Sequence, residues 1–187
     1  MVPVTHAKQF DPYPASPSFW LMKNVIALVT ATLAASPVFA DISVRFIESA
    51  PKDRFVFVNG GCPLSQVAVE IDLTGSNGSL IFDVTAAGAG VEVFQPVEVQ
   101  SGAVTLMPAT DGDQKLLFRI DNFAAGAQVV ISADLDDVLI NGALGQIRVA
   151  DDELSGTAVR MTIDGQTVTA AFESGTDTAV LPHACTS

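Results

Sequence analysis

The chain has 187 residues, of which 21 are acidic and nine are basic, so its formal net charge at pH 7 is −12. Such a chain lacks the excess of Lys and Arg that attracts phosphate backbones and anionic lipid surfaces. The composition therefore argues against a nucleic-acid-binding protein and against binding to anionic membranes, and it suits a protein exported from the cell or one that binds cations.

The first 40 residues are expected to lie outside the folded domain. Residues 1–21 contain four prolines and no hydrophobic period, and we interpret them as a disordered extension ahead of the true start codon, with a long signal-peptide N-region as the alternative. Residues 22–40 have the order of a signal peptide, with a basic start, an apolar run (Val25–Ala35) and a cleavage site after Ala40. That run is shorter than the roughly 18 residues of a membrane-spanning helix. We therefore predict a signal-peptide helix rather than a buried core helix, export to the periplasm or the medium, and no membrane span in the mature chain, 41–187.

The mature chain is predicted to be all-β. Its dominant hydrophobic period is two, as in residues 67–73 and 159–164, which is the pattern of strands with one buried face. Asp164-Gly165 lies between two such runs and is typical of a two-residue hairpin turn, because both turn positions require positive φ. Asn77-Gly78 and Asn141-Gly142 are typical of further turns. The runs expected to form strands are 42–47, 54–59, 67–73, 79–85, 91–99, 103–107, 115–121, 128–135, 146–150, 159–163 and 167–173.

These short and closely spaced runs predict a single antiparallel β-sandwich of about ten strands, with a jelly-roll or an immunoglobulin-like order. A domain of this length buries roughly 70% of its unfolded surface, which is enough for one core. Cys62 and Cys185 are the only cysteines. In an oxidising compartment we expect them to form a disulfide, with two free thiols as the alternative.

Candidate catalytic residues are scarce in the mature chain. His183 is its only histidine and lies in the C-terminal tail, where side chains are usually exposed to solvent. Trp20 and Tyr13 are the only residues of their types, and both are removed with residues 1–40, so the aromatic platforms of sugar-binding sites are missing. We assign no catalytic or cofactor-binding residue and predict a protein that is not an enzyme. The alternatives are a secreted hydrolase or lyase that uses carboxylates, and a purely structural envelope component.

Acidic clusters are the remaining candidate site. Calcium takes six to eight oxygen ligands, and closely spaced carboxylates between strands often supply them. The alternative is a solvated surface, since strand alternation would turn Asp134 and Asp136 outward and Leu135 inward. A third acidic run, 151–153, is open to the same two interpretations. The candidate calcium ligands are Asp111, Asp113, Asp134, Asp136 and Asp137.

Three stretches of the mature chain, Ala50–Gly60, Ser79–Pro96 and Val130–Asp137, resemble small secreted bacterial proteins labelled "aggregation factor core". The resemblance implies a secreted β-sandwich with a role in adhesion or aggregation. Its partner would be a protein or cell-surface component, or another copy of the chain. It supplies no site residues.

Overall fold

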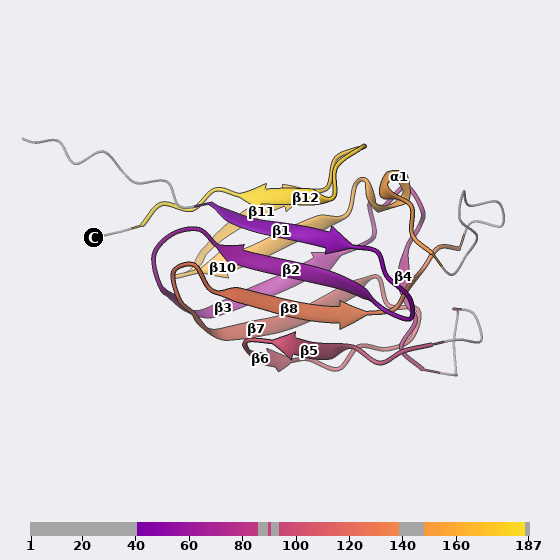
Figure 1. Ribbon diagram of the computed structural model, residues 1–187, viewed down its shortest axis with the longest axis horizontal. Helices are drawn as coiled ribbons and strands as arrows, with labels where there is room; N and C mark the ends of the chain where they lie inside the picture. The colour runs from indigo at the N-terminus through magenta and orange to yellow at the C-terminus, as the bar shows by residue number, and fades with distance from the viewer. Residues whose placement is uncertain (1–40, 86–89, 91–93, 139–147, 186–187) are drawn as a thin grey trace, which may run out of the picture. The chain divides into compact units, whose positions relative to one another are not determined.

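The computed structural model describes residues 41–85, 90, 94–138 and 148–185. These residues form two five-stranded antiparallel sheets that pack against each other, with a two-stranded ribbon at one end (Figure 1). The predicted antiparallel β-sandwich is confirmed. The predicted extension 1–21, the signal peptide 22–40 and the turn Asn141-Gly142 lie outside the described residues.

The strand order of the first sheet is β12-β1-β2-β8-β5, and that of the second is β11-β10-β3-β7-β6. The first sheet contains β1 (Ile42–Ile47), β2 (Asp53–Asn59), β5 (Glu98–Ser101), β8 (Gln128–Ala133) and β12 (Thr178–Leu181). The second contains β3 (Leu64–Asp72), β6 (Ala103–Leu106), β7 (Lys115–Phe123), β10 (Ala158–Ile163) and β11 (Gln166–Ala171). The ribbon pairs β4 (Ile81–Phe82) with β9 (Leu135–Asp136), and α1 (Asp151–Leu154) is a single helical turn.

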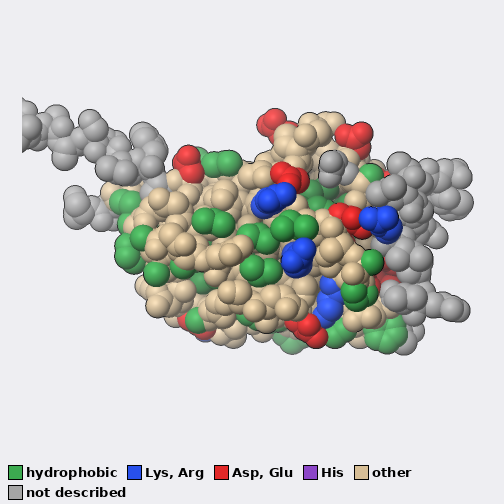
Figure 2. Space-filling view, in the orientation of Figure 1, with side chains coloured by type: hydrophobic (Ala, Val, Ile, Leu, Met, Phe, Trp, Pro, Cys, Tyr) green, Lys and Arg blue, Asp and Glu red, His purple; other side chains and the backbone are tan. Residues whose placement is uncertain are grey.

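Alternation along the strands builds the core. On β10, Val159, Met161 and Ile163 are buried while the residues between them are partly exposed, as their period predicts. Aromatic rings join the two sheets, since Phe57 of β2 meets Phe118 of β7 edge-on with their centroids 5.5 Å apart. The outer face over β1, β2 and β8 carries hydrophobic side chains between scattered charged ones (Figure 2).

Local signals predicted the hairpin between β10 and β11 correctly. Asp164 and Gly165 have φ of 49° and 78°, and Ile163 pairs with Gln166 across the turn. Positive φ at both positions is the geometry of a type I′ turn, which matches the right-handed twist of the two strands.

Several predicted strands differ in the structure. The run 79–85 contains only the two residues of β4, the run 91–99 is a strand only from Glu98 among its described residues, and β12 was not predicted. The strand predicted at 146–150 is wrong for its described part. Here the carboxylate of Glu153 accepts a hydrogen bond from the N–H of Ala150 (2.7 Å) and begins α1 instead.

The predicted disulfide between Cys62 and Cys185 is confirmed, with their Cα atoms 5.8 Å apart. It links the connection between β2 and β3 to the residues that follow β12. Among the described residues, no helix has the length and apolar character that crossing a membrane would require.

Candidate metal centre

The backbone brings three segments side by side where β2 begins and β8 ends (Figure 1). On one side, β4 pairs with β9, with Ile81 opposite Asp136. On the other side, the N–H of Phe82 donates to the carbonyl of Asp113 (2.9 Å), and the N–H of Gly112 donates to the carbonyl of Phe82 (3.0 Å). β4 therefore lies between β9 and residues 111–113, two of the predicted acidic clusters.

Asp83 follows β4 directly and lies at the centre of this arrangement. Its N–H donates to the carbonyl of Asp134 (3.0 Å), which fixes its backbone beside the start of β9. Its side chain is 1% exposed, and neither carboxyl oxygen meets a hydrogen-bond donor in the described part of the chain. Burial, together with the neighbouring carboxyl groups of Asp111 and Asp136, raises the pKa of Asp83 to about 7. A side chain at Gly90 would overlap this carboxyl group, so backbone closes the site there.

The two neighbours of Asp83 are held by different means. Oδ1 of Asp111 accepts hydrogen bonds from the backbone N–H groups of Val84 (2.9 Å) and Thr85 (3.1 Å), which orient its carboxylate. Asp136 belongs to β9 and is 1% exposed. Three carboxyl groups from three separate segments thus meet, of which Asp83 and Asp136 are buried and Asp111 is partly exposed.

Two further acids extend the cluster towards the first sheet. Asp53 begins β2, is 5% exposed and accepts a hydrogen bond from the N–H of Ser49 (3.0 Å). Burial raises its pKa to about 7, and the charges of Glu48 and Asp134 add to this effect. Asp134 is also 5% exposed, and its Oδ2 has no hydrogen-bond partner among the described residues. Burial and the charge of Asp136 raise its pKa to about 7, although Lys52 opposes the shift.

Of the five predicted calcium ligands, the structure places Asp111 and Asp136 beside Asp83, and Asp134 near Asp136. Asp137 is also buried, at 1% exposed. The carboxylate of Asp113 instead accepts a hydrogen bond from the N–H of Thr110 (2.7 Å) within its own loop. Sequence reasoning missed Asp53 and Asp83. Asp83 stands alone in an apolar run, and Asp53 lies between Lys52 and Arg54, so neither belongs to an acidic cluster in the sequence.

The alternative of a solvated acidic surface is wrong for Asp134 and Asp136. It assumed that one strand continues through both residues, whereas β8 ends at Ala133 and β9 begins at Leu135 as the partner of β4. The change of partner removes the outward orientation that simple alternation predicts.

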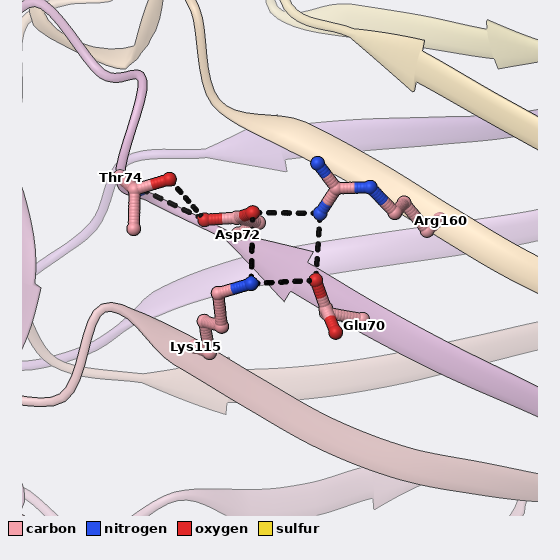
Figure 3. Close-up of polar contacts among 5 residues, drawn as sticks. All are labelled: Glu70, Asp72, Thr74, Lys115 and Arg160. Atoms are coloured by element: carbon pink, nitrogen blue, oxygen red, sulfur yellow. Dashed lines mark hydrogen bonds and ion pairs between the residues drawn. The ribbon is translucent and has the colours of Figure 1, made fainter.

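A second group of acids, on the outer face of the second sheet, shows the contrast (Figure 3). Nη1 of Arg160 lies 2.6 Å from Oε1 of Glu70, and Nζ of Lys115 lies 3.2 Å from carboxylate oxygens of both Glu70 and Asp72. Burial alone would raise the pKa of Asp72, but hydrogen bonds from Thr74, Arg160 and Lys115 hold it well below its usual range. Each acid here has a basic partner, so this group needs no bound cation to offset its charge.

Within the described ranges, no three His, Cys, Asp or Glu side chains are already arranged as the ligand set of a metal ion. The carboxyl groups around Asp83 can instead share protons, or turn towards a cation that neutralises them. Comparison of the chain with family models, with curated proteins and with solved structures gives no match.

Proposed function

We propose that the chain is an exported, non-enzymatic β-sandwich that binds a protein or cell-surface partner, and that its acidic end binds calcium. Export is supported by the signal-peptide pattern of residues 22–40 and by the disulfide, a bond that persists in oxidising compartments such as the periplasm and the medium. The resemblance of three stretches to the "aggregation factor core" proteins supports a role in adhesion or aggregation.

The environment of Asp83 is the observation that carries the calcium proposal. A buried carboxylate without a donor is costly, and two more carboxyl groups beside it increase that cost. A divalent cation removes the repulsion and supplies the missing partner. Because every side chain that converges here offers oxygen, the chemistry suits calcium better than zinc.

Calcium binding requires a small rearrangement of the cluster. The ion needs six to eight oxygens at about 2.3–2.6 Å, so Asp83, Asp111 and Asp136 must turn their carboxylates towards one point. Backbone carbonyls and water can complete the shell. Asp111 can take part without losing its backbone contacts, because its two amide donors both bind Oδ1.

The burial of these acids favours a binding role over catalysis. A catalytic carboxyl must reach its substrate, whereas Asp53, Asp83, Asp134 and Asp136 are at most 5% exposed. A hollow of about 380 Å³ is lined by residues that are close to some of these acids in sequence, but its lining, which includes Val84 and Leu106, is mainly apolar. The alternatives, a carboxylate-based hydrolase or lyase and a structural envelope component, have less support.

Thermal unfolding of the exported form tests the proposal. Millimolar calcium should raise Tm more than sodium chloride of the same ionic strength, because a cation that binds only the native state stabilises it by about 2.7 kcal/mol at a hundred times its Kd. Asp83→Asn should abolish the calcium effect, and it should raise Tm without calcium because it removes a buried charge.

Asp164→Asn is the matched control. It removes an exposed acid from the hairpin turn, where Asn tolerates the positive φ, and it should leave the calcium effect intact. Equal shifts with calcium and with matched salt would contradict the calcium proposal.

A further inference from the structure

The edge strand β11 lacks the protection that the edge strands β5 and β6 have in the described part of the chain. Natural sheets protect their edges with charges, prolines or bulges, because unpaired backbone groups there recruit other strands. The pairings of the edge strands β5 and β6 both contain a register shift, at Val99/Ser101 and at Ala103/Val104. β11 pairs with β10 without a shift over all six of its residues, and it contains no charged residue and no proline.

The hairpin register shows which backbone groups of β11 are open. Ile163 and Gln166 flank the two-residue turn, so their backbones exchange two hydrogen bonds. Every second pair along the hairpin is bonded in the same way, in agreement with the hydrogen bond from the N–H of Phe172 to the carbonyl of Thr157 (2.9 Å). Gln166, Val168 and Ala170 therefore bond to β10. The alternate residues, Thr167, Thr169 and Ala171, direct their N–H and C=O groups away from it. No backbone partner for them exists among the residues described.

The neighbouring edge strand, β12, also pairs without a register shift and lacks charged residues and prolines, but it has only four residues and is protected at its start. The hydroxyl of Thr176 accepts from the N–H of Thr178 (3.3 Å) and donates to its carbonyl (2.9 Å), which occupies both groups at the start of β12. A hollow of about 370 Å³ lies between residues 169–171 and 178–180. β11 and β12 contact each other, but Thr167, Thr169 and Ala171 are exposed, so the outer edge of β11 is accessible.

We propose that β11 is a self-association edge that pairs antiparallel with β11 of a second copy, with the two-fold axis at Thr169. Thr169 then lies opposite its own counterpart, and Thr167 lies opposite Ala171 of the other copy. These are the residues with open backbone groups, so each pair exchanges two hydrogen bonds. The two five-stranded sheets become one continuous sheet across the axis.

A second copy fits this edge because the strand is its own complement. An isologous pair closes on itself and needs no other partner sequence. At the axis, Thr169 meets Thr169 of the other copy, a favourable cross-strand pair of a kind that the hairpin already contains, with the hydroxyls of Thr162 and Thr167 2.9 Å apart. A single strand pair buries much less than the roughly 1,200 Å² of stable interfaces, so the association is weak and reversible.

The register also predicts how charge affects the pairing. With the axis at Thr169, Glu173 of one copy faces Gly165 of the other and lies beside its Asp164. Both acids are exposed, so their repulsion weakens the dimer at low salt and is screened at high salt.

Sedimentation velocity of the exported form in EDTA, over a range of protein and salt concentrations, tests the proposal independently of calcium. A dimer should appear with rising concentration and should strengthen with salt. Glu173→Lys should strengthen it at low salt by pairing with Asp164 of the other copy. Asp41→Lys is the control with the same change in net charge, and it should leave the association close to that of the unchanged protein.

Thr169→Pro should abolish the dimer, because it removes an N–H that points outward and is not used by β10, whereas Thr169→Ala keeps that N–H and should dimerise. If Thr169→Pro fails to fold, cross-linking of Thr169→Cys tests the same pairing. Cα atoms in a hydrogen-bonded antiparallel pair are about 5.5 Å apart, within disulfide range, so mild oxidation should cross-link this variant.

Thr105→Cys, on the bulged edge strand β6, should cross-link much more slowly than Thr169→Cys. Equal cross-linking of the two variants would overturn the proposal. So would a monomer under every condition, or a dimer that survives Thr169→Pro.

Discussion

Nη1 of Arg160 lies 2.6 Å from Oδ2 of Asp72, and the same nitrogen lies 2.6 Å from Oε1 of Glu70 (Figure 3). The carboxylate of Asp72 is almost fully buried, with only 6% of its side chain exposed. Arg160→Gln should lower the free energy of unfolding by about 1–3 kcal/mol, because it leaves a buried charge with fewer partners. Urea unfolding measures this difference.

Arg45→Gln is the matched control for that prediction. It breaks the ion pair with Asp177, but both side chains are more than 40% exposed, so the free energy of unfolding should change by at most about 0.5 kcal/mol. Equal losses in the two variants would show that the burial of Asp72 contributes little.

The raised pKa values predict an unusual dependence of stability on pH. Asp53, Asp83 and Asp134 have folded-state pKa values of about 7, so between about pH 4 and 7 the folded state holds protons that the unfolded state has released. In EDTA, Tm should therefore fall as the pH rises through this range. Asp72 acts in the opposite direction, since its contribution is present above its unfolded pKa and is lost at lower pH.

Stability should accordingly be greatest in mildly acidic buffer. Each of these carboxyl groups changes the free energy of unfolding by at most about 1.4 kcal/mol per pH unit, so Asp83→Asn should make stability depend less steeply on pH between pH 5 and 7. Tm measured in a pH series in EDTA tests this. A Tm that rises steadily from pH 5 to 8 would contradict the assignment of buried protonated carboxyl groups.

The sequence could predict features that neighbouring residues determine, but not those that depend on strand pairing. The turn at Asp164-Gly165 follows from its two residues, and the buried face of β10 follows from alternation along one strand. Asp83 has no such signal, because its burial depends on β9 and on residues 111–113, which are distant in sequence. The candidate site was therefore only half predicted.

Two glycines with positive φ should respond differently to substitution. Gly156 has φ of 91°, and a Cβ there would overlap the carbonyl oxygen of Gly75, whereas Gly165 has φ of 78° and open space around it. Gly165→Ala should cost only the left-handed backbone strain of about 1–2 kcal/mol. Gly156→Ala should cost more, because the backbone must also move. Urea unfolding of both variants compares them, and equal costs would contradict the close packing of residues 75 and 156.

The disulfide should contribute a large part of the stability of the domain. Cys62 and Cys185 are 123 residues apart, and closing a loop of that length stabilises the folded state by up to about 5 kcal/mol in the chain-entropy model. Reduction, or the double substitution Cys62→Ser with Cys185→Ser, should lower the urea midpoint strongly.

Reductant supplies the control for this prediction, since it should lower the midpoint of the unchanged protein and have no effect on the double variant. Because the bond holds the residues after β12 to the connection between β2 and β3, amide hydrogen exchange should rise first in β12 and β1 when it is broken. Thiol labelling of the denatured, unreduced protein should find no free cysteine. Two labelled thiols per chain, or equal midpoints with and without reductant, would show that the bond does not stabilise the folded protein.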